Sequence, residues 1–427
     1  MHLFPARLLL TLSLALSFNC LTAQQSIRVL FIGNSYTGVN NLPQLTSWVT
    51  ASGGDTLEFD ASTPGGYTFQ GHSSYNPTLT LLAQGGYDFV VLQEQSQLPS
   101  FPLAQVQSQC FPYAAMLDSL IRLHNPCAET VFYRTWGRKN GDASNCPNWP
   151  PVCTYAGMDS LLALRYQMMA DDNDAFVAPV GEVWKYIRTQ YPAIELYDSD
   201  ESHPSPAGSY AAALTFYTTF LRKDPSLITY DYTLLPWIAS DIRTAARAVV
   251  YDSLSKWNIG QWDPLADFAV SYPTPGYAEF VNASLYADQF IWDFGDGTWD
   301  TTGPGTIGHQ YAPNTGPFMV TLRAMKCQAA DTFSMLVNPL PVGISDQGGQ
   351  QPFFAPNPAD HQIVLNAPWN RELVCNIMDM RGAGLLQASL SAGMTVLDVH
   401  SLPPGAYILE LRERNLPVFH GKLLICR

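Results

Sequence analysis

Continuous apolar segments alternate with helical patterns from residue 26 to residue 260, and this alternation constrains the fold more than any other feature. Strands are expected at residues 27–32, 56–59, 88–92, 130–133 and 175–180. Helices are expected at residues 42–51, 103–123, 158–169 and 207–220. Strands that are apolar throughout and separated by helices form a parallel sheet that is covered on both faces. The sequence therefore predicts one α/β domain over residues 24–262.

A different pattern begins after Trp262, where helical spacing ends and short alternating β segments with Pro and Gly turns follow. This pattern predicts a small β-sandwich over residues 263–344. Residues 345–352 are polar and Gly-rich, which is typical of a linker. A second small all-β module is expected over residues 353–427, with strands at 361–365, 372–378, 395–399 and 406–411.

The N-terminus has the features of a secretory signal peptide. His2 and Arg7 precede an apolar run over residues 8–16, and small residues follow that run. The run is shorter than the ~20 residues that span a membrane, and no later stretch of the sequence is long and apolar enough. Cys20 would suit a lipoprotein signal, but its neighbours are poor ones for lipid attachment. We therefore expect removal of residues 1–23 and a secreted or cell-surface protein without a membrane span.

Charge and cysteine content exclude several classes of protein. Acidic residues outnumber Lys and Arg by 36 to 22, and no Lys/Arg-rich run is present, so no nucleic-acid partner is expected. No CxxC pair or Cys/His spacing predicts zinc, and neither a metal nor an organic cofactor is expected. Export permits disulfides. Cys146 and Cys153 flank a Pro-rich loop that a disulfide could close, but with Cys110 and Cys127 also present the pairing stays open.

A serine follows the first expected strand directly. Gly33, Asn34 and Ser35 connect that strand to the next helical pattern. In an open parallel sheet, ligands bind at the carboxyl ends of the strands. A serine at this place has an exposed hydroxyl and a backbone N–H near a helix N-terminus, which are the needs of a nucleophile. The simpler alternative is that Ser35 only caps the helix.

A histidine with a nearby carboxylate precedes the last expected helix. Asp200 and His203 are three residues apart, so they can meet on one turn, and a catalytic base needs such an orienting carboxylate. The other histidines of the domain, His72 and His124, have no comparable partner in sequence, which makes His203 the candidate base. Alternatively, His203 lies on the surface and Asp200 favours the following helix N-terminus.

The segments FIGNSYT (residues 31–37) and DESHPS (residues 200–205) resemble the first and last blocks of the SGNH (GDSL-type) hydrolases. That family has a flavodoxin-like three-layer α/β/α sandwich, in agreement with the alternation of strands and helices. The resemblance implies that Ser35 is the nucleophile, His203 the general base and Asp200 its orienting acid. It also implies an oxyanion hole built from the backbone N–H groups of Ser35 and of a glycine in the second block, for which Gly66 fits.

Two positions depart from the family pattern. Asn34 stands where the family usually has Asp, and we expect it to lie beside the substrate. The third family block normally ends in Gly-x-Asn, whose Asn is the third oxyanion donor, whereas this chain has LQEQS at residues 92–96. A glutamine amide can donate the same hydrogen bond. Gln93 or Gln95 is therefore expected to replace the missing donor.

The two β modules carry resemblances of their own. WDFGDG at residues 292–297 resembles a PKD domain, an immunoglobulin-like sandwich. Its aspartates could suggest calcium, but turn chemistry explains Asp and Gly there more simply. The segments PNPADHQIVL and LPPGAYILEL within residues 353–427 resemble the C-terminal sorting domain of type IX secretion cargo, which implies that the type IX machinery is a partner.

Together these features predict a secreted serine esterase that removes short acyl groups, acetyl above all, from carbohydrate through an acyl-enzyme. Trp136 and Trp149 are expected in exposed loops where they would stack on sugar rings, and simple loop packing is the alternative. Rival functions are a lipase or thioesterase, or a non-catalytic surface binding or adhesion protein on a degenerate hydrolase fold.

Overall fold

The computed structural model describes residues 24–312, 316–339, 353–367, 373–379, 383–390, 393–413 and 416–425. The expected signal peptide, residues 1–23, and the expected linker, residues 345–352, lie outside the described residues. Among the helices in the described ranges, none combines the length and the apolar character that crossing a bilayer requires.

Five parallel strands form the sheet of the first domain, in the order β2-β1-β3-β4-β5. They are β1 (Ser26–Ile32), β2 (Thr56–Ser62), β3 (Phe89–Leu92), β4 (Glu129–Tyr133) and β5 (Phe176–Ala178). This is the flavodoxin-like strand order, and it confirms the expected α/β class. The order reverses between β1 and β3, and such sheets bind ligands at the carboxyl ends of the strands beside this reversal.

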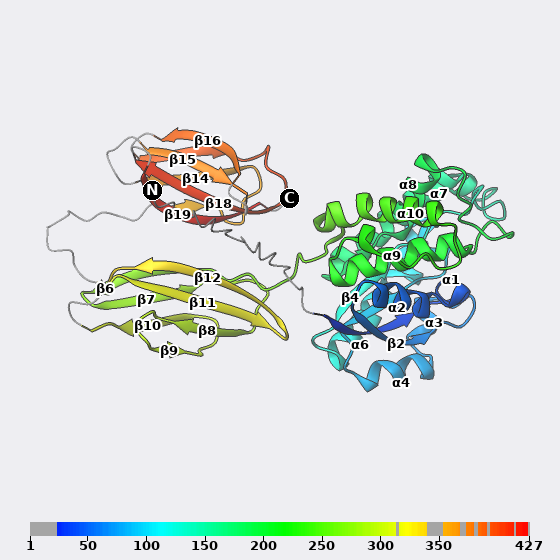
Figure 1. Ribbon diagram of the computed structural model, residues 1–427, viewed down its shortest axis with the longest axis horizontal. Coiled ribbons are helices and arrows are strands. Elements are labelled where there is room, and N and C mark those ends of the chain that lie inside the picture. Colours follow the sequence, from blue (N-terminus) through cyan, green and yellow to red (C-terminus); the bar gives the residue numbers. More distant parts are fainter. Residues whose placement is uncertain are drawn as a thin grey trace, which may run out of the picture.

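Helices cover both faces of the sheet. The α-helices are α1 (Ser35–Gly38), α2 (Leu42–Ser52), α3 (Phe69–His72), α4 (Asn76–Gln84), α5 (Leu103–Gln109), α6 (Phe111–His124), α7 (Tyr155–Asp172), α8 (Val180–Gln190), α9 (Pro206–Leu221) and α10 (Pro236–Val249). Short 3-10 helices are η1 (Val39–Asn41), η2 (Leu98–Ser100), η3 (Pro150–Cys153), η4 (Pro225–Leu227) and η5 (Tyr251–Trp257). In this strand order, crossovers of the usual right hand put α2 on one face and α4, α6 and α7 on the other. The deeply buried α9 packs beside α2 and α10 (Figure 1).

The helices differ from the sequence predictions in two respects. The single helix expected over residues 103–123 is divided into α5 and α6 at Cys110. Pro112, in the first turn of α6, has no N–H to donate to the preceding turn, and its ring prevents a continuous helix. The α-helices without a counterpart among the predicted elements are α1, α3, α4, α8 and α10.

Two antiparallel modules follow, in agreement with the change of pattern after Trp262. The first has sheets β10-β7-β6 and β12-β11-β8-β9 around a shared core that includes Phe280 and Trp292. Its strands are β6 (Phe268–Thr274), β7 (Tyr277–Asn282), β8 (Gln289–Asp293), β9 (Trp299–Asp300), β10 (Thr306–Gln310), β11 (Phe318–Lys326) and β12 (Ala329–Val337). The second module has sheets β13-β14-β17 and β16-β15-β18-β19. Its strands are β13 (Phe353–Ala355), β14 (Gln362–Ala367), β15 (Leu373–Met378), β16 (Gly384–Leu390), β17 (Gly393–Asp398), β18 (Gly405–Glu413) and β19 (Leu416–Ile425).

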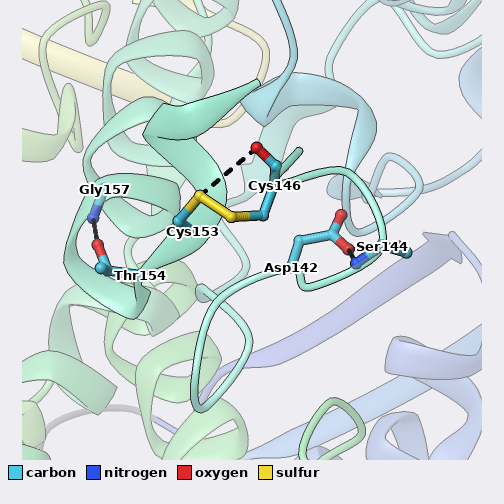
Figure 2. Close-up of a disulfide and its surroundings, with 6 residues drawn as sticks. All are labelled: Asp142, Ser144, Cys146, Cys153, Thr154 and Gly157. Carbon is cyan, nitrogen blue, oxygen red and sulfur yellow. Dashed lines mark hydrogen bonds between the residues drawn. A yellow bond between two sulfur atoms is a disulfide. The ribbon is translucent and has the colours of Figure 1, made fainter. Parts of the chain in front are cut away.

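Two disulfides are present among the described residues. Cys146 pairs with Cys153, as the Pro-rich loop suggested, and closes a loop beside Asp142 (Figure 2). Cys127 pairs with Cys327 and joins the residues before β4 to the β11–β12 turn. A cavity of about 680 Å³ lies between the two units at this place. Because β4 begins there, the first β module is attached at the amino edge of the parallel sheet, opposite to the edge that carries Ser35.

Candidate active site

Ser35 lies at the carboxyl end of β1, as its place in the sequence predicts. Strand β1 ends at Ile32, and Asn34 caps α1 by accepting a hydrogen bond from Tyr36 N through its side-chain oxygen at 3.1 Å. Gly33 is required here by close packing, because a Cβ at this position would lie 2.6 Å from Thr37 Oγ1. The backbone therefore turns sharply and presents Ser35 as the first residue of the helix.

The structure brings Ser35, His203 and Asp200 together in one hydrogen-bonded chain. His203 Nε2 lies 2.8 Å from Ser35 Oγ, and His203 Nδ1 lies 2.5 Å from Asp200 Oδ2. Asp200 Oδ1 also accepts the backbone N–H groups of Ser202 at 3.0 Å and His203 at 2.9 Å. Partial burial opposes ionisation, but these hydrogen bonds outweigh it and hold the pKa of Asp200 below its usual range. The carboxylate, imidazole and hydroxyl groups thus follow one another in the way that activates a serine nucleophile.

The turn that carries His203 is fastened to the rest of the site at several points. Tyr36 Oη and Ser202 Oγ are 2.6 Å apart, and Trp136 Nε1 donates to Ser202 O at 3.1 Å. The side chain of Asn40 donates to Pro204 O at 3.0 Å. These bonds come from the β1 and β4 ends of the sheet, so they fix the histidine turn against the nucleophile turn.

The expectation that Trp136 stacks on substrate from an exposed loop is wrong. Trp136 is 0% exposed and lies between the parallel rings of Tyr36 and Trp184, with centroids at 5.0 and 3.6 Å. Trp149 is half-buried and donates Nε1 to Ser100 O at 2.9 Å. Packing is therefore the correct interpretation of Trp136, because a large aromatic side chain stabilises most when it is buried.

Asn34 is almost completely buried, which corrects the expectation that it lies beside the substrate. It is 2% exposed, and its side-chain Nδ2 donates to Tyr67 O at 2.9 Å while its oxygen caps α1. An aspartate could not make the bond to Tyr67 O, since a carboxylate has no N–H to donate. The departure from the family pattern thus has a structural reason, which is the attachment of the Tyr67 loop.

Gly66 lies in that loop, and it has φ +70° and open space where a Cβ would be. A positive φ suits glycine, and the absence of a side chain leaves its peptide accessible. Within the described ranges, no residue accepts a hydrogen bond from the backbone N–H of Gly66 or of Ser35. Both N–H groups are therefore free to bind a ligand.

The two candidate glutamines are engaged elsewhere. Gln93 is 0% exposed, and its Oε1 accepts Asn34 N and Thr37 Oγ1, each at 2.9 Å. Its amide N–H donates to Glu94 O. Gln95 bonds within its own loop, where its Oε1 accepts Gln97 N at 2.8 Å. Gln93 therefore holds the nucleophile turn through Asn34 and Thr37. Gln95 instead stabilises the loop that follows β3.

Two buried groups beside the site were missed by the sequence analysis. His72 is buried behind the nucleophile turn, with Nε2 2.8 Å from Gly33 O and Nδ1 2.8 Å from Thr78 Oγ1. Burial lowers the pKa of His72, so it stays neutral and donates from Nε2 to the carbonyl. Glu94 is the second such group, and no sequence signal separates it from the adjacent glutamines. Among the described residues, no set of three His, Cys, Asp or Glu side chains is placed to hold a metal ion.

Solved structures similar to this chain include several hydrolases. A Slackia heliotrinireducens protein classed among the SGNH hydrolases is 27% identical, with a TM-score of 0.38, over 45% of this chain and 97% of that one. A DUF4886 family protein from Bacteroides uniformis is 17% identical, with a TM-score of 0.46, over 54% of this chain and 95% of that one. An acetyl xylan esterase is 14% identical, with a TM-score of 0.33, over 45% of this chain and 98% of that one.

A comparison with curated protein sequences gives no match. A family model does match the end of the chain. Residues 354–425 match the secretion system C-terminal sorting domain, which indicates export by the type IX system and a secreted or cell-surface location.

Proposed function

We propose that the α/β domain is a serine esterase of the SGNH type. The observation that carries this proposal is the chain of contacts from Ser35 Oγ to His203 Nε2 at 2.8 Å and from His203 Nδ1 to Asp200 at 2.5 Å. A serine oxygen becomes a nucleophile when an adjacent base takes its proton. The same contacts speak against a degenerate, purely adhesive domain, because an unused site has no reason to align three such groups.

The reaction divides into two displacements. Ser35 Oγ attacks the ester carbonyl carbon while its proton moves to His203 Nε2, and Asp200 stabilises the imidazolium through Nδ1–H. The carbonyl oxygen becomes an oxyanion, which the free N–H groups of Ser35 and Gly66 stabilise. His203 then gives the proton to the leaving alkoxide as its bond to carbon breaks. Water attacks the acyl-enzyme by the same path and restores the Ser35 hydroxyl.

The substrate proposed is a short acyl ester, acetyl above all, on carbohydrate. Its support is an exported protein with accessory β modules, the first of which we propose is a PKD domain. The burial of Trp136 removes the stacking argument, so the substrate class depends on export and on the open surroundings of Gly66. A lipase or a thioesterase is the rival activity. A lipase differs in the acyl length that it prefers, and a thioesterase in the sulfur of its leaving group.

The decisive experiment is hydrolysis of 4-nitrophenyl esters by the purified protein. Ser35→Ala should lower kcat by roughly 10³–10⁶ and leave the fold intact. Ser108→Ala, an exposed serine on α5, is the matched control and should behave as the wild type. If Ser35→Ala keeps more than a few per cent of the activity, the assignment fails. Acetate should be preferred to octanoate, and release of acetate from acetylated oligosaccharides tests the acceptor.

A further inference from the structure

Glu94 is a fully buried carboxyl group at the end of β3, next to the loop that carries Gly66. It is 0% exposed, and both of its carboxyl oxygens lie 3.1 Å from Phe69 N. Its Oε1 also accepts the backbone N–H of Gln95 at 2.6 Å. A buried carboxyl group with no role would be costly, so its three backbone contacts call for an explanation.

Two of those contacts fix Phe69, the C-terminal end of the segment that runs from Gly66 to Phe69. Phe69 begins α3 and is itself 0% exposed, so its N–H is a rigid point close to Gly66 in sequence. Closer to Gly66, the same segment is held at Tyr67, because the side chain of Asn34 donates to Tyr67 O. The peptide of Gly66 therefore lies beside two fixed points, one set by the nucleophile turn and one by the end of β3.

We infer that Glu94 is a positioning residue that aims the Gly66 N–H at the ester carbonyl oxygen. This inference rests on the proposed function. Glu94 does not touch substrate, since no part of it reaches the surface. Its effect passes through Phe69 N to the segment that precedes it. A displacement of a reacting or stabilising group by about 1 Å can cost roughly 10²-fold in rate.

The protonation state of Glu94 gives the inference a readout that a structural role would not have. The titratable groups that face Glu94 are the Cys110 thiol and the Tyr166 hydroxyl, and no salt bridge within the described ranges includes Glu94. Burial raises the pKa of Glu94 to about 8. At neutral pH the group is thus mostly the uncharged acid, which accepts both backbone N–H groups through Oε1.

Ionisation above that pH adds a buried negative charge near the place where an oxyanion must form. Like charges in a low-dielectric site repel strongly, so kcat should fall as pH rises through about 8. Glutamine has the shape of the uncharged acid, with a carbonyl oxygen in the place of Oε1 and no ionisation. Glu94→Gln should therefore keep the neutral-pH activity and lose the alkaline fall.

The test measures kcat and KM of the full chain with 4-nitrophenyl acetate from pH 6 to 9.5, corrected for spontaneous hydrolysis. Glu94→Ala should lower kcat about 10–100-fold with KM changed by less than about threefold. Glu94→Gln should lie within about threefold of the wild type at pH 7 and be flat where the wild type falls. Glu58→Gln, an exposed glutamate on β2, is the control and should keep the wild-type profile.

Three outcomes would overturn the inference. They are a wild-type kcat in a folded Glu94→Ala protein, an alkaline fall that persists in Glu94→Gln, and equal losses in kcat for both variants at pH 7. A failure of the proposed function looks different, because wild type and Ser35→Ala would then hydrolyse the ester equally, whatever the Glu94 variants do.

Discussion

The side-chain amide of Asn34 donates to the carbonyl oxygen of Tyr67 at 2.9 Å, and this bond joins the nucleophile turn to the loop that carries Gly66. The two segments are far apart in sequence, and each contributes one free backbone N–H to the same edge of the sheet. Their relative position therefore depends on a side chain that is itself buried and not available to substrate.

Asn34→Asp tests this relationship with a minimal change of shape. The carboxylate would place an oxygen against Tyr67 O, and an unsatisfied buried acceptor costs about 1–3 kcal/mol. We expect kcat/KM on 4-nitrophenyl acetate to fall roughly tenfold or more, with the loss mainly in kcat. The control is Asn140→Asp, because Asn140 bonds Glu201 at the surface. Wild-type kinetics in folded Asn34→Asp would show that the Tyr67 bond has no role in the site.

Asp200→Asn should lower kcat by roughly 10²–10⁴ without unfolding the protein, because an amide favours the wrong tautomer of His203. Asp198→Asn, an exposed position in the same turn, should leave kcat unchanged.

The depressed pKa of Asp200 means that its contribution to the free energy of unfolding is complete above the normal carboxyl range. That contribution is lost as pH falls through the folded-state pKa of Asp200. Urea unfolding at pH 7 and pH 3 checks the sign: the stability difference between wild type and Asp200→Asn should shrink at the lower pH.

The sequence alone was sufficient for the parts of the molecule that local patterns determine. Apolar strands between helices predicted the parallel sheet, and the motifs around Ser35 and His203 predicted which side chains would meet. It was not sufficient where tertiary contacts decide: Trp136 looks like a loop residue in sequence, yet rings from α1 and α8 bury it. The pairing of Cys127 with Cys327 spans 200 residues and two folded units, which no local spacing encodes.

Trp136→Ala should destabilise the α/β domain by about 3–5 kcal/mol, as large-to-small changes of buried aromatic residues do. Trp136→Phe keeps a ring between Tyr36 and Trp184 but removes the N–H that bonds Ser202 O. It should cost less stability and still lower kcat, because the histidine turn loses a support. Thermal unfolding and kcat together check this. A stable Trp136→Ala protein whose main defect is a raised KM for a glycan ester would contradict the buried role.

Removal of both β modules should leave the chemistry intact, since the first of them is joined to the sheet at the edge opposite to Ser35. A chain ending at Pro264 keeps Asp263, which pairs with Arg222, and Cys127→Ser removes the thiol that truncation would expose. Its kcat/KM on 4-nitrophenyl acetate should lie within about threefold of the full chain. Full-length protein with Cys127→Ser and Cys327→Ser separates loss of the disulfide from loss of the modules. If the truncated protein is folded but inactive, the first β module completes the site.

Gln93 and Gln95 give the sharpest comparison, because both lie just after β3 and the same substitution can be made at both. Gln93→Ala leaves the buried N–H of Asn34 without its acceptor at 2.9 Å and frees the nucleophile turn to shift. The cost should resemble the loss of one oxyanion donor, roughly 10²–10³ in kcat with little change in KM.

Gln95→Ala removes bonds only within the loop after β3, so it should lower stability slightly and keep near-normal kcat. The pair thus separates support of the nucleophile turn from general loosening of the loop, provided that circular dichroism shows both proteins folded. Near-normal kcat in both variants would mean that the turn is positioned without Gln93. A large loss of kcat in Gln95→Ala alone would instead mean that Gln95 is the third oxyanion donor, although in the structure it bonds only within its own loop.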